Sequence, residues 1–219
     1  MGWVRFDPFG WLTRWIPGGI LHGCVRAAAV VVLTGFLALR VGQYNRFALK
    51  PLWAVETLLF AVLLAAYAVR RPPVERARGG REILVPLLGA VLPFALLTSP
   101  PHPLVASNPA VLGAVFWWMT VATAFTVWGL GYLGRSFSIT VEARALVSRG
   151  PYRWVRHPVY LGEMATAAAV ALWRWSPGNG VLLALFVAVQ LLRSRWEEEK
   201  LARVFPAYRG LCQHSRWFW

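Results

Sequence analysis

The stretch Leu146–Glu163, LVSRGPYRWVRHPVYLGE, combines a turn with the start of a helix. Gly150-Pro151 predicts the turn, and Pro158 suits the first position of a helix. His157 therefore stands at a helix N-terminus, where free N–H groups and the positive end of the helix dipole favour an anionic ligand group. This position indicates a site for a charged small molecule.

The same stretch brings several kinds of reactive group together. Tyr152 and Arg156 precede the helix, and Tyr160 and Glu163 lie three residues apart on one of its faces. A phenol, an imidazole, a guanidinium and a carboxylate would then meet at one place. A purely structural interpretation is equally open, with arginines facing lipid headgroups and tyrosines anchoring the chain at the interface.

A second polar stretch, Leu192–Tyr208, reads LRSRWEEEKLARVFPAY. Its helical period places Arg193 and Glu197 four residues apart on one face. Leu201, Phe205 and Tyr208 continue an apolar stripe. The alternative interpretation is a solvated helix with intrahelical salt bridges.

The composition indicates which elements must position these groups. Of 219 residues, 58 % are hydrophobic and 15 % charged, and the formal net charge is +14. Basic residues between long apolar runs are typical of a polytopic membrane protein facing anionic lipid. This pattern excludes a disordered chain, a disulfide scaffold and a soluble nucleic-acid binder. Cys24 and Cys212 lie far apart in the sequence, and we expect neither a disulfide nor a metal site.

Six apolar runs approach the roughly 20 residues that a helix needs to cross a bilayer. They are Ile20–Leu39, Pro51–Val69, Ile83–Ser99, Pro109–Leu133, Pro158–Trp175 and Gly178–Leu192. The predicted fold is an all-α membrane bundle of about six spans. Ser176-Pro177-Gly178-Asn179 joins the last two as a helical hairpin, so the two polar stretches at its open end must share one membrane face.

The distribution of basic residues predicts the orientation. With both termini in the cytoplasm, most Lys and Arg residues fall on the inner side, as the positive-inside rule requires. We therefore expect an inner-membrane protein whose polar stretches face the cytoplasm. Trp3–Trp15 is interpreted as an amphipathic helix on the inner leaflet, and the tail Ser215–Trp219 as a similar anchor.

Gly129, Gly131 and Gly134 reproduce the dinucleotide-binding pattern GxGxxG. That pattern binds pyrophosphate only where a strand turns into a helix, and here it ends an apolar run. We interpret these glycines as positions for close helix contact and for a turn out of the bilayer.

The paired motifs resemble a known superfamily. GPYRxxRHPxYxG, followed by RxRxEE and an LxxxFPxY tail, is similar to the isoprenylcysteine carboxyl methyltransferases and phospholipid methyltransferases, which are integral membrane enzymes. The resemblance covers residues 134–219 and implies S-adenosylmethionine as methyl donor. It implies a methyltransferase core over residues 134–219. The hydropathy pattern places an amphipathic segment at 1–19 and four spans within 20–133 before this core.

The resemblance also implies roles for particular residues. Cofactor-binding roles fall to Leu146, Val147, Tyr152, His157, Pro158, Val159, Tyr160 and Glu197. Arg193 would be catalytic and would face the methyl-accepting group. Because Glu199 adds a third acid to the motif, the register leaves Glu197 and Glu198 open as the cofactor ligand.

The acceptor is predicted to be a lipid or another lipophilic molecule, and its reacting group stays open. An isoprenylcysteine-type carboxylate needs no base, and Arg193 would orient it. A phospholipid amine or a small thiol must lose a proton, which makes His157 or Glu163 a candidate base. A non-enzymatic transporter or assembly protein on the same scaffold is the alternative of another class. The sequence does not indicate an oligomeric state.

Overall fold

We describe a computed structural model of the chain, covering residues 18–47, 49–69, 71, 73–75, 77 and 79–214. The described residues form helices and one isolated β-bridge, between Glu75 and Ala143. The α-helices are α1 (Gly18–Gly42), α2 (Lys50–Ala68), α3 (Gly79–Ala95), α4 (Pro103–Ala106), α5 (Pro109–Leu133), α6 (Pro158–Trp173), α7 (Pro177–Val204) and α8 (Tyr208–His214). The predicted all-α membrane bundle is confirmed.

Each of the six predicted apolar runs lies on a helix. Among the described residues, four helical segments are long and apolar enough to cross a membrane: Lys50–Ala68, Arg81–Thr98, Pro109–Ser136 and Pro177–Val204. Helix α6 has 16 residues, and the described apolar part of α1 is Ala27–Gly42. The predicted segments Trp3–Trp15 and Ser215–Trp219 lie outside the described residues.

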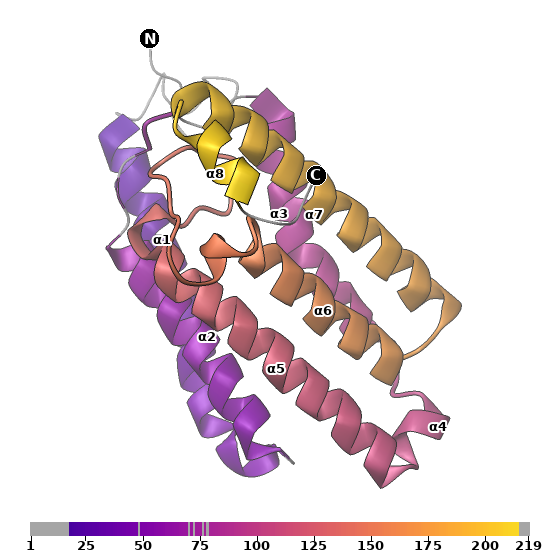
Figure 1. Cartoon of the computed structure of the whole chain (residues 1–219). Helices are drawn as coiled ribbons and strands as arrows, with labels where there is room; N and C mark the ends of the chain where they lie inside the picture. The colour runs from indigo at the N-terminus through magenta and orange to yellow at the C-terminus, as the bar shows by residue number, and fades with distance from the viewer. Residues whose placement is uncertain are drawn as a thin grey trace.

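The long helices lie side by side in a bundle (Figure 1). Helix α2 contacts α1 and α5, α6 lies between α5 and α7, and α3 contacts α7. One apolar core joins α5, α6 and α7 around Met119, Ala169 and Phe186. A second core joins α2, α5 and α6 around Tyr67, Leu130 and Val159.

Small residues let α5 and α6 approach closely. A Cβ atom at Gly162 would lie 2.9 Å from the backbone oxygen of Ala122, and one at Gly129 would lie 3.0 Å from Val159. Gly134 ends α5 with φ +45°. Gly129 thus serves helix contact and Gly134 a turn, as the sequence predicted, whereas a Cβ atom at Gly131 would have no neighbour within 4 Å.

The predicted hairpin of the last two runs is present, and its second helix is much longer than the apolar run. Ser176 caps α7 by accepting a hydrogen bond from the Asn179 backbone at 3.1 Å. Helix α7 continues unbroken from Pro177 to Val204, because the charged residues after Leu192 keep a helical pattern. It therefore carries the second polar stretch on a rigid element.

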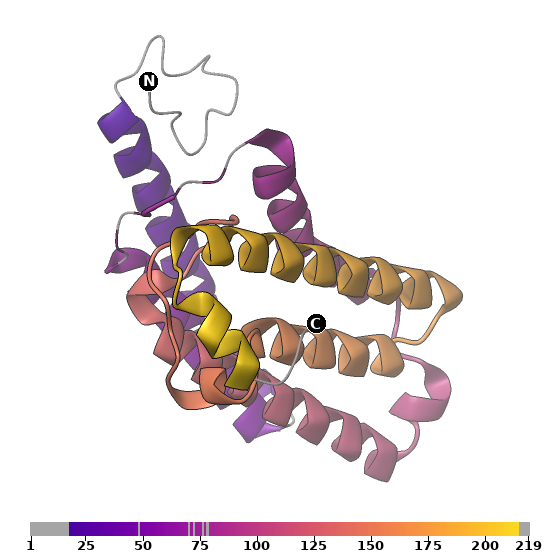
Figure 2. The same ribbon diagram turned by 45° about the horizontal axis from the view of Figure 1, so that its top comes forward.

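The connector between α5 and α6, residues 134–157, crosses the end of the bundle where α7 finishes. In Figure 2, α8 turns back from the end of α7 and lies beside this connector. The connector is mostly irregular, with the short 3₁₀ helix η5 at Gly150–Arg153. A loop over the ends of several helices can close a cavity between them.

Candidate functional site

A cavity of about 370 Å³ lies between α2, α3, α5, α6 and α7, beneath the connector and α8. Its volume falls within the roughly 300–1,000 Å³ typical of small-molecule sites. We call the part lined by Tyr152, Arg156, His157, Tyr160, Arg193 and Glu197 the polar end. We call the part lined by Ala90, Pro93, Phe94, Leu96, Val170 and Phe186 the apolar end.

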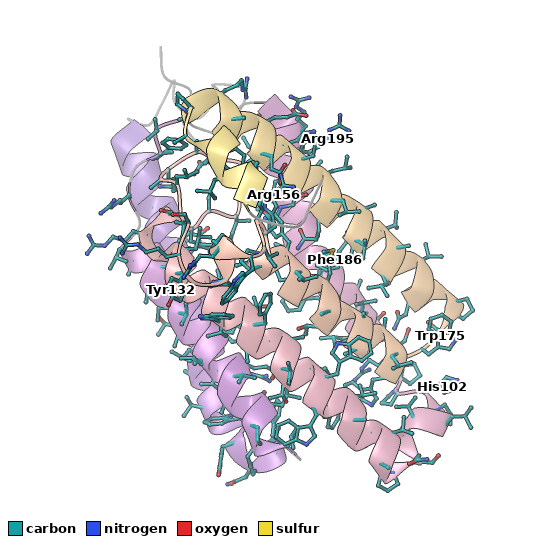
Figure 3. All side chains as sticks on the ribbon, viewed as in Figure 1. His102, Tyr132, Arg156, Trp175, Phe186 and Arg195 are labelled. Atoms are coloured by element: carbon teal, nitrogen blue, oxygen red, sulfur yellow. The ribbon has the colours of Figure 1, made fainter. Side chains whose placement is uncertain are left out.

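The polar end and the apolar end of the cavity lie at successive positions along α6 and α7. Figure 3 shows Arg156 beside α8, Phe186 farther along between α6 and α7, and Trp175 at the opposite end of the hairpin. A polar and an apolar compartment therefore share one cavity, which suits two reactants of different solubility.

Tyr160 connects the two polar stretches at the polar end. Its hydroxyl donates a hydrogen bond to Oε1 of Glu197, and the Arg193 guanidinium carbon lies 4.6 Å from the centroid of its ring. Arg193 is held further by a 3.0 Å hydrogen bond from Nη2 to the backbone oxygen of Ile139. The hairpin thus brings together the residues that the two motifs predicted to be neighbours.

The three consecutive acids have three different environments. Glu197 lines the cavity. Glu198 pairs with Arg156 Nη1 and His157 Nε2, both at 3.1 Å. Glu199 is exposed and pairs with Arg195 at 3.4 Å. The geometry thus places the first acid, and not the second, in position to contact a ligand in the cavity.

His157 precedes α6 and is buried. Its ring stacks on that of Tyr160, with centroids 5.4 Å apart and an interplanar angle of 4°. Glu198 occupies its Nε2 side. His157 therefore lines the cavity with its aromatic ring, and its Nε2 edge is in hydrogen-bond contact with Glu198 on α7.

Tyr152 projects into the cavity from η5. Gly150 starts this turn with φ +59°, and a Cβ atom there would lie 2.6 Å from the ring of Tyr132. Burial, together with the nearby carboxylates of Glu197 and Glu163, holds the pKa of Tyr152 well above its ordinary value. Its hydroxyl is therefore neutral and able to donate a hydrogen bond at physiological pH.

Most of the predicted site residues line this one cavity: Leu146, Val147, Tyr152, His157, Val159, Tyr160, Arg193 and Glu197. Pro158 is buried as the first residue of α6 and is absent from the cavity wall. It begins the helix, and its predicted contact with the cofactor stays a prediction.

Sequence reasoning missed two polar features of the connector. Arg144 Nη2 donates to Glu142 Oε2 at 2.6 Å, and both residues line the cavity. Lys200 Nζ donates to Glu82 Oε2 at 2.6 Å and to the backbone oxygen of Val141 at 3.0 Å. Neither pair follows a local spacing rule. Glu142 and Arg144 lie in an irregular segment, and Lys200 on α7 meets Glu82 on the distant helix α3.

Tyr208 covers the polar end from α8. It is buried, and burial, reinforced by Glu198, raises the pKa of its hydroxyl above the ordinary value. The sequence predicted an apolar stripe of Leu201, Phe205 and Tyr208 along this segment. Leu201 and Tyr208 line the cavity, as that stripe predicted. Phe205 instead ends α7.

Residues 104–207 match the sequence model of the phospholipid methyltransferase family. No curated protein and no solved structure matches the chain. The matched segment contains the first polar stretch and all of the second except Tyr208, and it confirms the resemblance described above. The match supports a membrane methyltransferase of the phospholipid and isoprenylcysteine type, and the four apolar helical segments support an integral membrane protein.

Proposed function

We propose that this protein transfers a methyl group from S-adenosylmethionine to a lipophilic acceptor at the cytoplasmic membrane face. The observation that carries the proposal is the meeting of Tyr160, Arg193 and Glu197 at the polar end of a cavity whose other end is apolar. A water-soluble donor and a lipid acceptor could each reach the compartment that suits it.

The donor set fits this cofactor. S-adenosylmethionine carries a carboxylate, an ammonium group and two ribose hydroxyls. Among the described residues, Arg144 Nε and Nη1 are buried without a hydrogen-bond partner, and Arg144 lines the cavity. Such donors suit a carboxylate, while the Glu197 carboxylate suits an ammonium group or hydroxyls.

Each predicted residue then has a physical task. When bound, the cofactor supplies an electrophilic methyl group on a sulfonium. Leu146, Val147 and Val159 provide apolar contact, and the rings of Tyr152 and His157 enclose the polar end. Methyl transfer is a displacement that needs alignment and exclusion of water. The buried Arg193, fixed by Ile139 and Gln190, is placed to orient the acceptor.

The membrane face follows from charge. The polar end lies at the end of the bundle where Arg149, Arg153 and Arg156 precede α6. Arginine-rich loops of membrane proteins remain on the cytoplasmic side. We place the site there, next to the aqueous cofactor pool, with both chain termini on the same side.

Binding of S-adenosylhomocysteine to the purified protein tests the proposal. Glu197→Gln removes the carboxylate of the cavity, and we expect affinity to fall about 10- to 100-fold, since hydrogen bonds to charged groups contribute about 1.5–3 kcal/mol. Glu199→Gln is the matched control, because this acid is exposed, and its affinity should equal that of the wild type. Equal affinity for all three proteins would remove the site assignment.

Labelled methyl transfer into a lipid extract tests the activity itself. Incorporation that depends on Arg193 supports the proposal. A protein that neither binds S-adenosylhomocysteine nor transfers label would favour the non-enzymatic alternative.

A further inference from the structure

Glu163 lies at the boundary between the two ends of the cavity. On α6 it follows the polar residues His157 and Tyr160, and the next cavity-lining residues on its face are Thr166, Ala167 and Val170. It is thus the last charged side chain of α6 before the apolar end. A lipophilic acceptor entering from the apolar end would meet Glu163 as it approaches the cofactor.

A chain of hydrogen bonds fixes this carboxylate. Gln190 Nε2 donates to Glu163 Oε2 at 2.5 Å, and Gln190 Oε1 accepts from Arg193 Nη1 at 2.7 Å. Because arginine can only donate, the amide must turn its oxygen to Arg193 and its nitrogen to Glu163. Gln190 is 1 % exposed. The arrangement therefore requires a Glu163 oxygen that accepts, which the ionised carboxylate provides through either of its oxygens and the neutral acid through its carbonyl oxygen alone.

The charges around this point disfavour an anionic acceptor. Glu163, Glu197 and Arg193 all line the cavity. Arg193 donates to Gln190 through Nη1 and to Ile139 through Nη2, and its Nε is buried with no hydrogen-bond partner among the described residues. Of the other cations on the cavity wall, Arg156 is paired with Glu198, and Arg144, which pairs with Glu142 through Nη2, is assigned above to the cofactor carboxylate. An acceptor carboxylate beside Glu163 would add a like charge in a poorly solvated place.

We propose that Glu163 is the proton acceptor of the reaction and that it selects an acceptor bearing an N–H or S–H group over a carboxylate. This inference rests on the proposed function. The lone pair of the acceptor nitrogen or sulfur forms the new bond to the methyl carbon. The old carbon–sulfur bond breaks with its electron pair on sulfur, which becomes the neutral thioether of S-adenosylhomocysteine. The proton of the acceptor passes to the Glu163 carboxylate.

Three probes with the same tail separate the acceptor classes: dodecylamine, dodecanethiol and dodecanoate. We expect transfer to the amine or the thiol and none to the carboxylate, and which of the two reacts identifies the acceptor atom. Glu163→Gln should lower that transfer about 100-fold or more, within the range for loss of a general base. Its affinity for S-adenosylhomocysteine should stay within about twofold of the wild type, and Glu199→Gln should keep full activity. Glu163→Asp, which retains the carboxylate, should recover part of the rate.

Alkaline treatment of products from a labelled lipid extract gives a second, independent answer. Methyl esters release methanol in alkali, whereas N-methyl and S-methyl groups remain attached. Label that resists alkali supports the inference. Ester label, an unchanged rate in Glu163→Gln, or no transfer to any acceptor by protein that binds S-adenosylhomocysteine would overturn it. Loss of S-adenosylhomocysteine binding in the wild type would instead contradict the proposed function.

Discussion

The hydroxyl of Tyr160 donates a hydrogen bond to the carboxylate of Glu197, across the two helices of the last hairpin. The two residues are 37 positions apart in the sequence. Their contact joins the motif at the start of α6 to the motif near the end of α7. The polar end of the cavity is therefore built from both helices of the hairpin.

Tyr160→Phe should test this contact with little disturbance elsewhere. The phenyl ring keeps the stacking on His157 and the position under Arg193, and only the hydroxyl is lost. We expect affinity for S-adenosylhomocysteine to fall about tenfold, corresponding to about 1.5 kcal/mol for a hydrogen bond to a charged group. Tyr132→Phe is the control, because Tyr132 is 47 % exposed. Calorimetry that gives equal affinities for both variants would contradict this role for the hydroxyl.

Arg193→Lys should separate binding of the acceptor from binding of the cofactor. Lysine keeps the charge but not the planar fork, so the bonds to Gln190 and Ile139 cannot both be kept in their present geometry. We expect kcat for methyl transfer to fall about 100-fold, as for the loss of one positioned donor. Affinity for S-adenosylhomocysteine should change much less. Arg195→Lys provides the control, since Arg195 is exposed. A variant that loses cofactor affinity and keeps kcat would assign Arg193 to the cofactor instead.

The sequence could predict the helices and the two halves of the site, because both follow from local patterns. Apolar runs locate helices, Pro158 and Ser176 begin them, and a tight turn closes the hairpin. The helical period alone placed Arg193 and Glu197 on one face. The register of the three acids could not be predicted, because it depends on the rotation of α7 relative to α6.

The ion pairs between residues far apart in the sequence could not be predicted from local spacing rules either. Glu56 pairs with Arg40 across α1 and α2, although Arg40 follows the predicted apolar run. The partner of Lys200 is Glu82, 118 residues away. No spacing connects such residues, since only the order of helices in the bundle makes them neighbours.

Lys200→Met should destabilise the protein without touching the cavity wall. Lys200 and Glu82 are 1 % and 6 % exposed, and removing one member of a buried pair costs about 3–5 kcal/mol. We therefore expect a clear drop in the thermal unfolding midpoint in detergent. Adding Glu82→Leu removes the buried carboxylate that has lost its lysine and should recover much of the loss. A single variant as stable as the wild type would contradict the buried-pair interpretation.

Gly162→Ala should disrupt the contact between α5 and α6. The added methyl group would meet Thr126 and the backbone oxygen of Ala122 at 2.9 Å, and backbone atoms cannot move aside without shifting a helix. Overpacking of this kind costs about 1–3 kcal/mol. Gly113→Ala is the matched control on α5, where a Cβ atom would have no neighbour within 4 Å. The control should be neutral or slightly stabilising, because alanine favours helices, and equal unfolding midpoints in the two variants would contradict the close contact.

Arg144→Met should reveal which part of the cofactor the connector holds. Arg144 donates to Glu142 through Nη2, while Nε and Nη1 are buried with no hydrogen-bond partner in the described part of the chain. If these donors bind the cofactor carboxylate, the variant should lose about 10- to 100-fold in affinity for S-adenosylhomocysteine. 5′-Methylthioadenosine, which lacks the amino-acid part, should bind the variant and the wild type equally. A parallel loss for both ligands would indicate that the substitution displaces the connector, because that change would weaken contacts to the nucleoside as well.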